Sequence, residues 1–171
     1  AELIKRSAWG KLAAWIASRT QELDLSAEPA LCVEPKIDGM SVSLIYDGGK
    51  LIQAATRGDG LTGDLITAQV IASGAVPVEV AELGRFEVRG ELYLPAAAFT
   101  ALNQRLVAAG DKPLVNPRNG CAGLMKRKDP QALSGVGVRG FLYFIPPGQA
   151  TCALPASQWE RLAWLKAQGF A

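Results

Sequence analysis

The sequence predicts a mixed α+β fold in which antiparallel strands, linked by hairpins, are flanked by helices. Residues 40–46 and 85–94 alternate apolar and polar side chains, as strands with one buried face do. Residues 7–23 instead repeat apolar side chains with helical spacing. With 171 residues, of which 49% are hydrophobic, the chain is long enough for one domain with a substantial core.

The N-terminal part of the chain is expected to hold one helix and one short strand. Trp9, Leu12 and Ile16 share one face of the helix predicted over residues 7–23. Residues 31–36 (LCVEPK) then predict a short strand that ends on Lys36. A charged amine at the end of such a strand raises the question of what it faces.

A hairpin is predicted over residues 40–56. Its two strands meet at an Asp-Gly-Gly turn, residues 47–49, because glycine tolerates the positive φ that a tight turn requires. The first strand has an apolar face, made by the even-numbered residues from Met40 to Tyr46, and a small polar face made by Ser41 and Ser43. One face is therefore expected to join the core, and the other has the character of the floor of a binding site.

The rest of the chain is predicted to contain helices and strands that end at glycine or proline. Glycine readily adopts the left-handed conformation that closes a helix, and proline lacks the N–H that a strand needs. Ser157 and Glu160 have the spacing of a capping box at the start of the last helix. The predicted elements are a helix over residues 65–74 closed by Gly74, a strand over 85–94, a helix over 96–110 ended by Gly110, a strand over 136–146 and a helix over 157–169 ended by Gly169.

The composition excludes several classes of chemistry. The sequence contains no histidine, which rules out a histidine base, nucleophile or metal ligand. Its net charge is only +2, so the bulk charge favours no particular partner. The three cysteines are widely spaced and form no Cys-x-x-Cys pair, which speaks against a disulfide framework or a zinc site. No signal peptide or membrane-spanning run is recognisable, and we expect a cytoplasmic protein.

Lys36 is the first candidate for chemistry. A lysine amine is a nucleophile when it loses its proton, and phosphate chemistry can use a charged lysine that does so as it attacks. Asp38, two residues on, can orient that amine or hold a metal ion, and Gly39 lets a nucleotide approach the backbone closely. A solvated lysine beside a hairpin is the simpler alternative for so short a motif.

Two further clusters carry polar side chains next to predicted strands. The glycine-rich residues 56–64 follow the second strand, where Arg57 and backbone N–H groups could cradle a phosphate, or the segment could be a plain surface turn. Glu91 lies within the strand over residues 85–94, on the same face as Arg89. Its carboxylate could accept a hydrogen bond from a ribose hydroxyl, bind a metal ion, or simply pair with Arg89.

Residues 116–129 form the one local concentration of basic side chains. They contain Arg118 and three consecutive basic residues that begin at Lys126, with no acidic residue before Asp129. Such a stretch suits the phosphates of a nucleotide or of DNA, because lysine and arginine neutralise their charge. A solvated basic loop is the alternative.

The order and spacing of four motifs are more specific than any one of them. EPKIDG, TRGDGLTGD, EVRGEL and NPRN followed by AG resemble the adenylation domain of NAD-dependent DNA ligases, and the resemblance covers residues 30–145. CAGLMKRKDPQALSGVGV and SQWERLAWLKAQGF are more similar to the second, shorter NAD-dependent ligase of some gammaproteobacteria.

The resemblance implies a nucleotidyltransferase fold and a covalent lysine intermediate. In that family the motif lysine, here Lys36, attacks the α-phosphate of NAD, releases nicotinamide mononucleotide and becomes lysyl-AMP. The AMP then passes to the 5′-phosphate of nicked double-stranded DNA, and the 3′-hydroxyl displaces it to seal the strand. The resemblance also implies Mg²⁺, since phosphoryl-type transfer depends on charge neutralisation and positioning.

The same resemblance implies a role for each matching residue. Lys126 stands where the principal ligases carry an arginine, so the charge is kept but the bidentate fork is lost. The implied contacts are Glu34 with adenine, Asp38 with ribose or Mg²⁺, Gly39 with the nucleotide, Arg57 with phosphates, Glu91 with ribose or Mg²⁺, Arg118 and Lys126 with the nucleotide or phosphates, and Tyr143 stacked on adenine.

The sequence predicts a fragment of that domain. The expected parts are an N-terminal helical segment over residues 1–29, a nucleotide-binding core over 30–145 and a C-terminal helix over 146–171. Two later strands of the family, each with an essential lysine, are not found, so we expect a monomeric chain that does not seal nicks alone. The alternatives are a nucleotidyltransferase that uses ATP or GTP, and a nucleotide- or DNA-binding module without activity.

Overall fold

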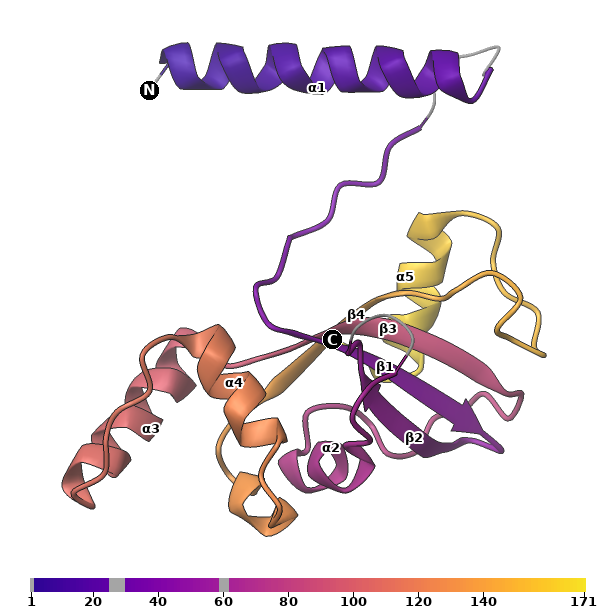
Figure 1. Ribbon diagram of the computed structural model, residues 1–171. Helices are drawn as coiled ribbons and strands as arrows, with labels where there is room; N and C mark the ends of the chain where they lie inside the picture. The colour runs from indigo at the N-terminus through magenta and orange to yellow at the C-terminus, as the bar shows by residue number, and fades with distance from the viewer. Residues whose placement is uncertain (1, 25–29, 59–61) are drawn as a thin grey trace. The chain divides into compact units, whose positions relative to one another are not determined.

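The computed structural model describes residues 2–24, 30–58 and 62–171 (Figure 1). The chain divides into two compact units, residues 1–34 and residues 35–171. The first unit contains helix α1 (Glu2–Glu22), which confirms the helix predicted over residues 7–23 and begins earlier. Arg19 and Glu22 form an ion pair on its last turn, with 2.6 Å between Nη1 and Oε2.

The second unit is built on a four-stranded antiparallel sheet with the strand order β2-β1-β3-β4. Helices precede and follow the strands, so the predicted mixture of helices and antiparallel strands is confirmed. The strands are β1 (Met40–Asp47), β2 (Lys50–Thr56), β3 (Phe86–Tyr93) and β4 (Arg139–Phe144); the helices are α2 (Thr67–Ser73), α3 (Ala96–Ala108), α4 (Pro117–Met125), the 3-10 helix η1 (Pro130–Leu133) and α5 (Gln158–Ala167).

The predicted hairpin is confirmed and gives the sheet two unlike faces. Gly48 and Gly49 turn the chain between β1 and β2 with φ of 56° and 76°, in the left-handed region that favours glycine. Val42, Leu44 and Tyr46 are buried on one face, whereas the serines between them are only half-buried on the other. The apolar alternation therefore sets which face of β1 is covered and which is left for polar side chains.

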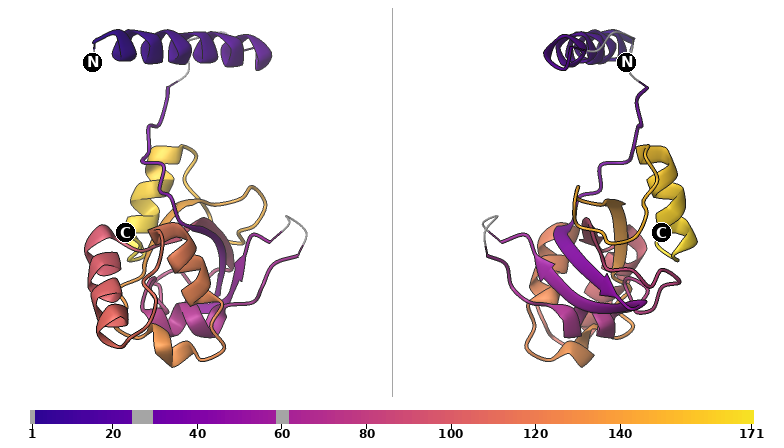
Figure 2. Two further views of the ribbon diagram at one scale, coloured as in Figure 1. Left: turned by 60° about the vertical axis from the view of Figure 1, so that its left-hand side comes forward. Right: turned by 90° about the vertical axis from the view of Figure 1, so that its right-hand side faces the viewer.

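The covered face of the sheet forms a single hydrophobic core with the helices. Tyr46 stacks on Phe86 with 5.2 Å between ring centroids, and Trp164 of α5 meets Phe86 edge-on at 5.1 Å. Burial raises the pKa of Tyr46, whose hydroxyl donates a 2.6 Å hydrogen bond to the carbonyl of Pro77. In Figure 1 and in both views of Figure 2, α5 lies near β4 and apart from α4.

The short strand predicted over residues 31–36 is wrong. Residues 30–38 contain no strand, and Leu31, Cys32 and Val33 are all exposed, so burial does not alternate along this stretch. Pro35 cannot donate a ladder hydrogen bond, and the boundary between the two units falls beside it, so the sheet begins only at Met40. Lys36 thus lies in extended chain ahead of β1 instead of at the end of a strand.

Helix α4 was not predicted and divides the basic stretch of residues 116–129. Asn116 caps it by accepting a 2.8 Å hydrogen bond from the backbone N–H of Asn119, and Pro117 occupies the first turn. Arg118 lies at the start of this helix and Lys126 at its C-terminal cap. None of the helices in the described ranges has the length and apolar character needed to span a bilayer.

Candidate functional site

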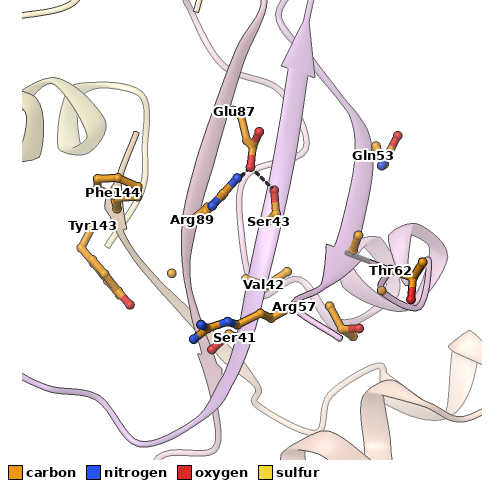
Figure 3. A pocket seen from close by; sticks show the side chains of 14 residues that line it. Ser41, Val42, Ser43, Gln53, Arg57, Thr62, Glu87, Arg89, Tyr143 and Phe144 are labelled. Carbon is orange, nitrogen blue, oxygen red and sulfur yellow. Dashed lines mark hydrogen bonds and ion pairs between the residues drawn. The ribbon is translucent and has the colours of Figure 1, made fainter. Parts of the chain in front are cut away.

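A pocket with a volume of about 570 Å³ lies over the polar face of the sheet (Figure 3). Strand β1 contributes Ser41 and Ser43 to its lining, as the alternation of that strand predicts. The neighbouring strands contribute most of the other polar and aromatic side chains, and Arg57 and Thr62 come from the segment after β2. The remaining lining residues are Val42, Gln53, Ala55, Thr56, Arg57, Thr62, Gly63, Glu87, Arg89, Gly90, Tyr143 and Phe144.

Three of the lining residues form a hydrogen-bonded group, which we call the pocket triad: Ser43, Glu87 and Arg89. Ser43 Oγ and Arg89 Nε donate to the same carboxylate oxygen of Glu87, at 2.7 and 2.6 Å (Figure 3). Burial raises the pKa of Glu87, but the hydrogen bonds from Ser43 and Arg89 and the charges of Arg89 and Arg85 outweigh it, so that pKa lies below its ordinary value. The carboxylate is therefore held in its charged form.

The second carboxylate of β3, Glu91, lies two residues after Arg89 and has a different partner from Glu87. It accepts a 2.7 Å hydrogen bond from Ser41 Oγ, and Ser41 and Glu91 are register partners across β1 and β3. Arg89 pairs with Glu87, so the alternative that Glu91 pairs with Arg89 is wrong. Burial, followed by the charge of Glu91, raises the pKa of the buried Cys121 thiol on α4 to about 12. Glu91 thus lies between the pocket rim and α4.

Tyr143 and Arg57 line the pocket from opposite edges of the sheet. Tyr143 is half-buried on β4, and its backbone carbonyl accepts a 2.8 Å hydrogen bond from Nε2 of Gln158, the first residue of α5. Arg57 is exposed and directly follows β2. The pocket therefore offers an aromatic ring on one side and guanidinium groups on others, a combination that suits a base together with phosphate. Residues 59–61 of the glycine-rich segment lie outside the described residues.

The candidates ahead of β1 lie outside the pocket lining. Lys36 is exposed, and no hydrogen bond or ion pair within the described part of the chain holds its amine. Asp38 forms an ion pair with Arg118 of α4, with 2.9 Å between Oδ1 and Nη1. Gly39 is buried against β3, where a Cβ would lie 2.3 Å from the carbonyl oxygen of Leu92. Glu34 lies in the first of the two units and is half-buried.

The other end of α4 is tied to the glycine-rich segment. Lys126 Nζ lies 3.0 Å from Asp64 Oδ2, and Gln69 of α2 donates a hydrogen bond to the carbonyl of Arg127. Both ion pairs of α4 are exposed, so solvent screens them strongly. Helix α4 consequently brings Arg118 close to Asp38 and Lys126 close to the glycine-rich segment, which the sequence alone could not show.

The described residues contain no cluster of three acidic or cysteine side chains that could enclose a metal ion. Mg²⁺ does not require such a cluster, because it is commonly bound by one or two carboxylates together with substrate phosphates and water. Asp38 and Glu91 each present one carboxylate of this kind. Either carboxylate is of the kind that Mg²⁺ takes as a ligand beside a phosphate-bearing substrate.

Glu87 and Arg89 of the pocket triad were not predicted as part of the site, whereas Ser43 was expected on its floor. The signal was available in the strand pattern, because Ser43 shares the polar face of β1 with Ser41, and Glu87 and Arg89 share the face of β3 with Glu91. What the pattern lacked was the register between these two strands, which are separated by about 40 residues of chain.

Comparison with known proteins matches this chain to one family. The family model described as NAD-dependent DNA ligase adenylation domain matches residues 8–171. A DNA ligase from Roseiflexus castenholzii is 38% identical over an alignment that covers 92% of this chain and 24% of the relative. DNA ligases from Rhodopseudomonas palustris (43% identical; 89% of this chain, 19% of the relative) and Chloroflexus aurantiacus (39%; 93% and 24%) are also similar. The chain thus spans about a quarter of the length of these curated relatives.

Proposed function

Because this chain belongs to the family of NAD-dependent DNA ligase adenylation domains, we propose that Lys36 is the nucleophile that becomes adenylated by NAD. Its Nζ forms a bond to the α-phosphorus, the bond from that phosphorus to the bridging oxygen breaks, and nicotinamide mononucleotide leaves. The amine loses its proton to solvent as it attacks. The product is lysyl-AMP, from which AMP passes to the 5′-phosphate of a nick before the 3′-hydroxyl displaces it.

The observation that carries this proposal is the exposed amine of Lys36, which no described residue engages, two residues before a carboxylate that is already held by an arginine. A nucleophilic amine must be able to reach its substrate, and the amine of Lys36 has no described partner to give up first. Asp38, two residues from Lys36 in the sequence, would orient the amine or the nucleotide. Phosphoryl-type transfer needs such positioning more than acid–base chemistry.

We assign the nucleotide contacts from the pocket and from the family motifs together. Tyr143 stacks on adenine, and Glu91, oriented by Ser41, accepts a hydrogen bond from the ribose. The contact of Glu34 with adenine is proposed from its family motif alone, because Glu34 belongs to the other unit. The phosphates are contacted by Arg57, Arg118 and Lys126, and Gly39 allows close approach to the backbone. The exposed ion pairs of Arg118 and Lys126 support this assignment, since either cation can exchange its aspartate for a phosphate at little cost.

Asp38 and Glu91 would hold Mg²⁺ together with the substrate phosphates. The ion supplies neutralisation of phosphate charge when it is bound. The same proposal includes a nucleotidyltransferase fold and domain limits at residues 29 and 145. It also includes nicked DNA as a partner in replication and repair. Similarity to the shorter ligase type, the monomeric state and the cytoplasmic location stay predictions.

Intact-protein mass spectrometry tests the proposal directly. The chain is incubated with Mg²⁺ and either NAD or ATP, alongside Lys36→Ala and the control Lys50→Ala, which removes another exposed lysine of the second unit. A mass gain of one AMP with NAD, kept in the control and lost in Lys36→Ala, is the expected result.

A gain with ATP alone would instead identify a nucleotidyltransferase that uses ATP. An adduct that persists in Lys36→Ala would contradict the assignment of the nucleophile. The absence of any adduct in the wild-type chain would favour a nucleotide- or DNA-binding module without the covalent step.

A further inference from the structure

We propose that Arg89, oriented by Glu87 and Ser43, is an additional phosphate-binding residue of the pocket, a role that none of the family motifs quoted above assigns to it. This inference rests on the proposed function, because it takes the pocket ligand to be a nucleotide. It adds a contact made by strand β3, from within the sheet, to those expected from the loops and from α4.

The hydrogen bonding of Arg89 leaves most of its donors available. Within the described residues its guanidinium group is bound to Glu87 through Nε alone, at 2.6 Å. An arginine has five N–H donors, and four of them are on the two terminal nitrogens. Arg89 lines the pocket, and about half of its side chain is exposed (Figure 3). Its terminal nitrogens can therefore form the paired hydrogen bonds that phosphate oxygens accept.

Glu87 acts as a positioning residue in this arrangement. The side chain of Glu87 is only 13% exposed, and its carboxylate is itself fixed by Ser43 Oγ, while Ser43 and Arg89 face each other across β1 and β3. An arginine on an exposed strand face would otherwise sample many rotamers, and a ligand would have to order it on binding. Anchoring at Nε removes part of that cost and fixes the plane of the guanidinium group.

The charges and shape of the pocket favour a nucleotide phosphate over other anions. Its lining carries two guanidinium groups, Arg57 and Arg89, against the single carboxylate of Glu87, so the net charge is positive. Tyr143 and Phe144 supply apolar and aromatic surface beside them. A small inorganic anion would leave that surface uncovered, whereas a nucleotide places a base and a phosphate on the same lining.

The test compares AMP with adenosine, which differ only in the phosphate, by isothermal titration calorimetry on the full 171-residue chain. The variants are Arg89→Ala, Glu87→Gln and, as a matched control, Arg85→Ala. Arg85 precedes β3 and is similarly exposed, but it pairs with Asp47 and lies outside the pocket lining. Adenosine affinity also serves as an internal check that each variant keeps its fold.

Arg89→Ala is expected to weaken AMP binding about 10-fold or more, the effect of losing a charge-assisted hydrogen bond, and to leave adenosine binding nearly unchanged. Glu87→Gln is expected to weaken AMP binding less, again without affecting adenosine, and Arg85→Ala to alter neither. If Glu87 only neutralised the charge of Arg89, Glu87→Gln would change AMP affinity in the opposite direction, because removing the negative charge would tighten AMP binding.

Tighter AMP binding by Glu87→Gln would overturn the positioning role. An equal loss of AMP and adenosine affinity in Arg89→Ala, or no loss, would overturn the phosphate contact. If either result occurred while wild-type chain still formed the AMP adduct on Lys36, the proposed function would stand and this inference alone would fail. Failure of the wild-type chain to bind either ligand would overturn the nucleotide pocket and the inference with it.

Discussion

The floor of the pocket and helix α4 both present charged side chains of the proposed site, but they hold them differently. On the floor, Glu87 is 13% exposed and accepts hydrogen bonds from Arg89 of its own strand and from Ser43 of the adjacent strand. Arg118 at the start of α4 instead forms one ion pair with Asp38, whose side chain is 76% exposed. The same chemistry, an arginine on a carboxylate, is thus nearly fixed in one region and readily exchanged in the other.

This difference indicates a division of labour within the site. Half-buried hydrogen bonds within a sheet keep a side chain in one geometry before any ligand arrives. Exposed ion pairs contribute about 0–1 kcal/mol each, so their members can be recruited by a competing phosphate. We expect the floor to provide a preformed surface and α4 to provide cations that change partners on binding.

Glycine substitution should produce the largest contrast between the two regions. A Cβ at Gly90 would lie 2.1 Å from the carbonyl oxygen of Phe141, whereas a Cβ at Gly123 in α4 meets nothing within 4 Å. Gly90→Ala is therefore expected to destabilise the chain by about 1–3 kcal/mol, the range for overpacking. Gly123→Ala should instead stabilise it by up to about 1 kcal/mol, because alanine favours a helix interior. Urea unfolding measures both, and an equal effect of the two would refute the contrast.

Removing the two carboxylates should give a smaller difference in the same direction. Glu87→Ala is expected to lower the free energy of unfolding by about 1–2 kcal/mol, since it removes two hydrogen bonds to a charged acceptor, one of them from a half-exposed arginine. Asp38→Ala should lower it by less than about 1 kcal/mol. Thermal unfolding of both variants beside the wild type decides this, and a larger loss for Asp38→Ala would reverse the ranking of the two regions.

Acidification should sharpen the comparison further. The pKa of Glu87 in the folded chain lies below its ordinary value of 4.5, so its charged form adds stability above that value and loses this contribution as the pH falls through the lowered pKa. The stability of the wild type relative to Glu87→Gln is therefore expected to be constant near neutral pH and to shrink below about pH 4.5. Urea titrations from pH 7 down to pH 3 measure this difference, and one that stays constant throughout would contradict the shift.

Local patterns predicted much of this fold because the hairpin, the alternation of β1 and the capping box are set by residues close in sequence. The box is present, with Ser157 and Glu160 each bonded to the backbone N–H of the other. The false strand over residues 31–36 came from apolar residues whose exposure depends on their surroundings rather than on their own pattern. Helix α4 was not predicted, although Asn116 followed by Pro117 is a helix-start signal. The basic residues of this stretch are equally typical of a solvated loop.

The parts of the site that could not be predicted depend on pairing between distant segments. Lys126 meets Asp64 across about 60 residues, and Ser43 meets Glu87 across more than 40. No local pattern determines which carboxylate pairs with an arginine, since Glu87 and Glu91 are each two residues from Arg89 on the same strand. The roles of Lys36 and of the nucleotide contacts stay predictions, because geometry alone does not report a covalent intermediate.

The cysteines offer a practical consequence for labelling this chain. Cys32 is exposed in the first unit, whereas burial raises the pKa of both Cys121 and Cys152, most strongly for Cys121. Thiolate is the species that reacts with maleimides, so the two shifted thiols react slowly at neutral pH. A fluorescent dye should therefore attach first at Cys32, four residues before Lys36 in the sequence, and would report on that part of the chain without altering a charged side chain of the site.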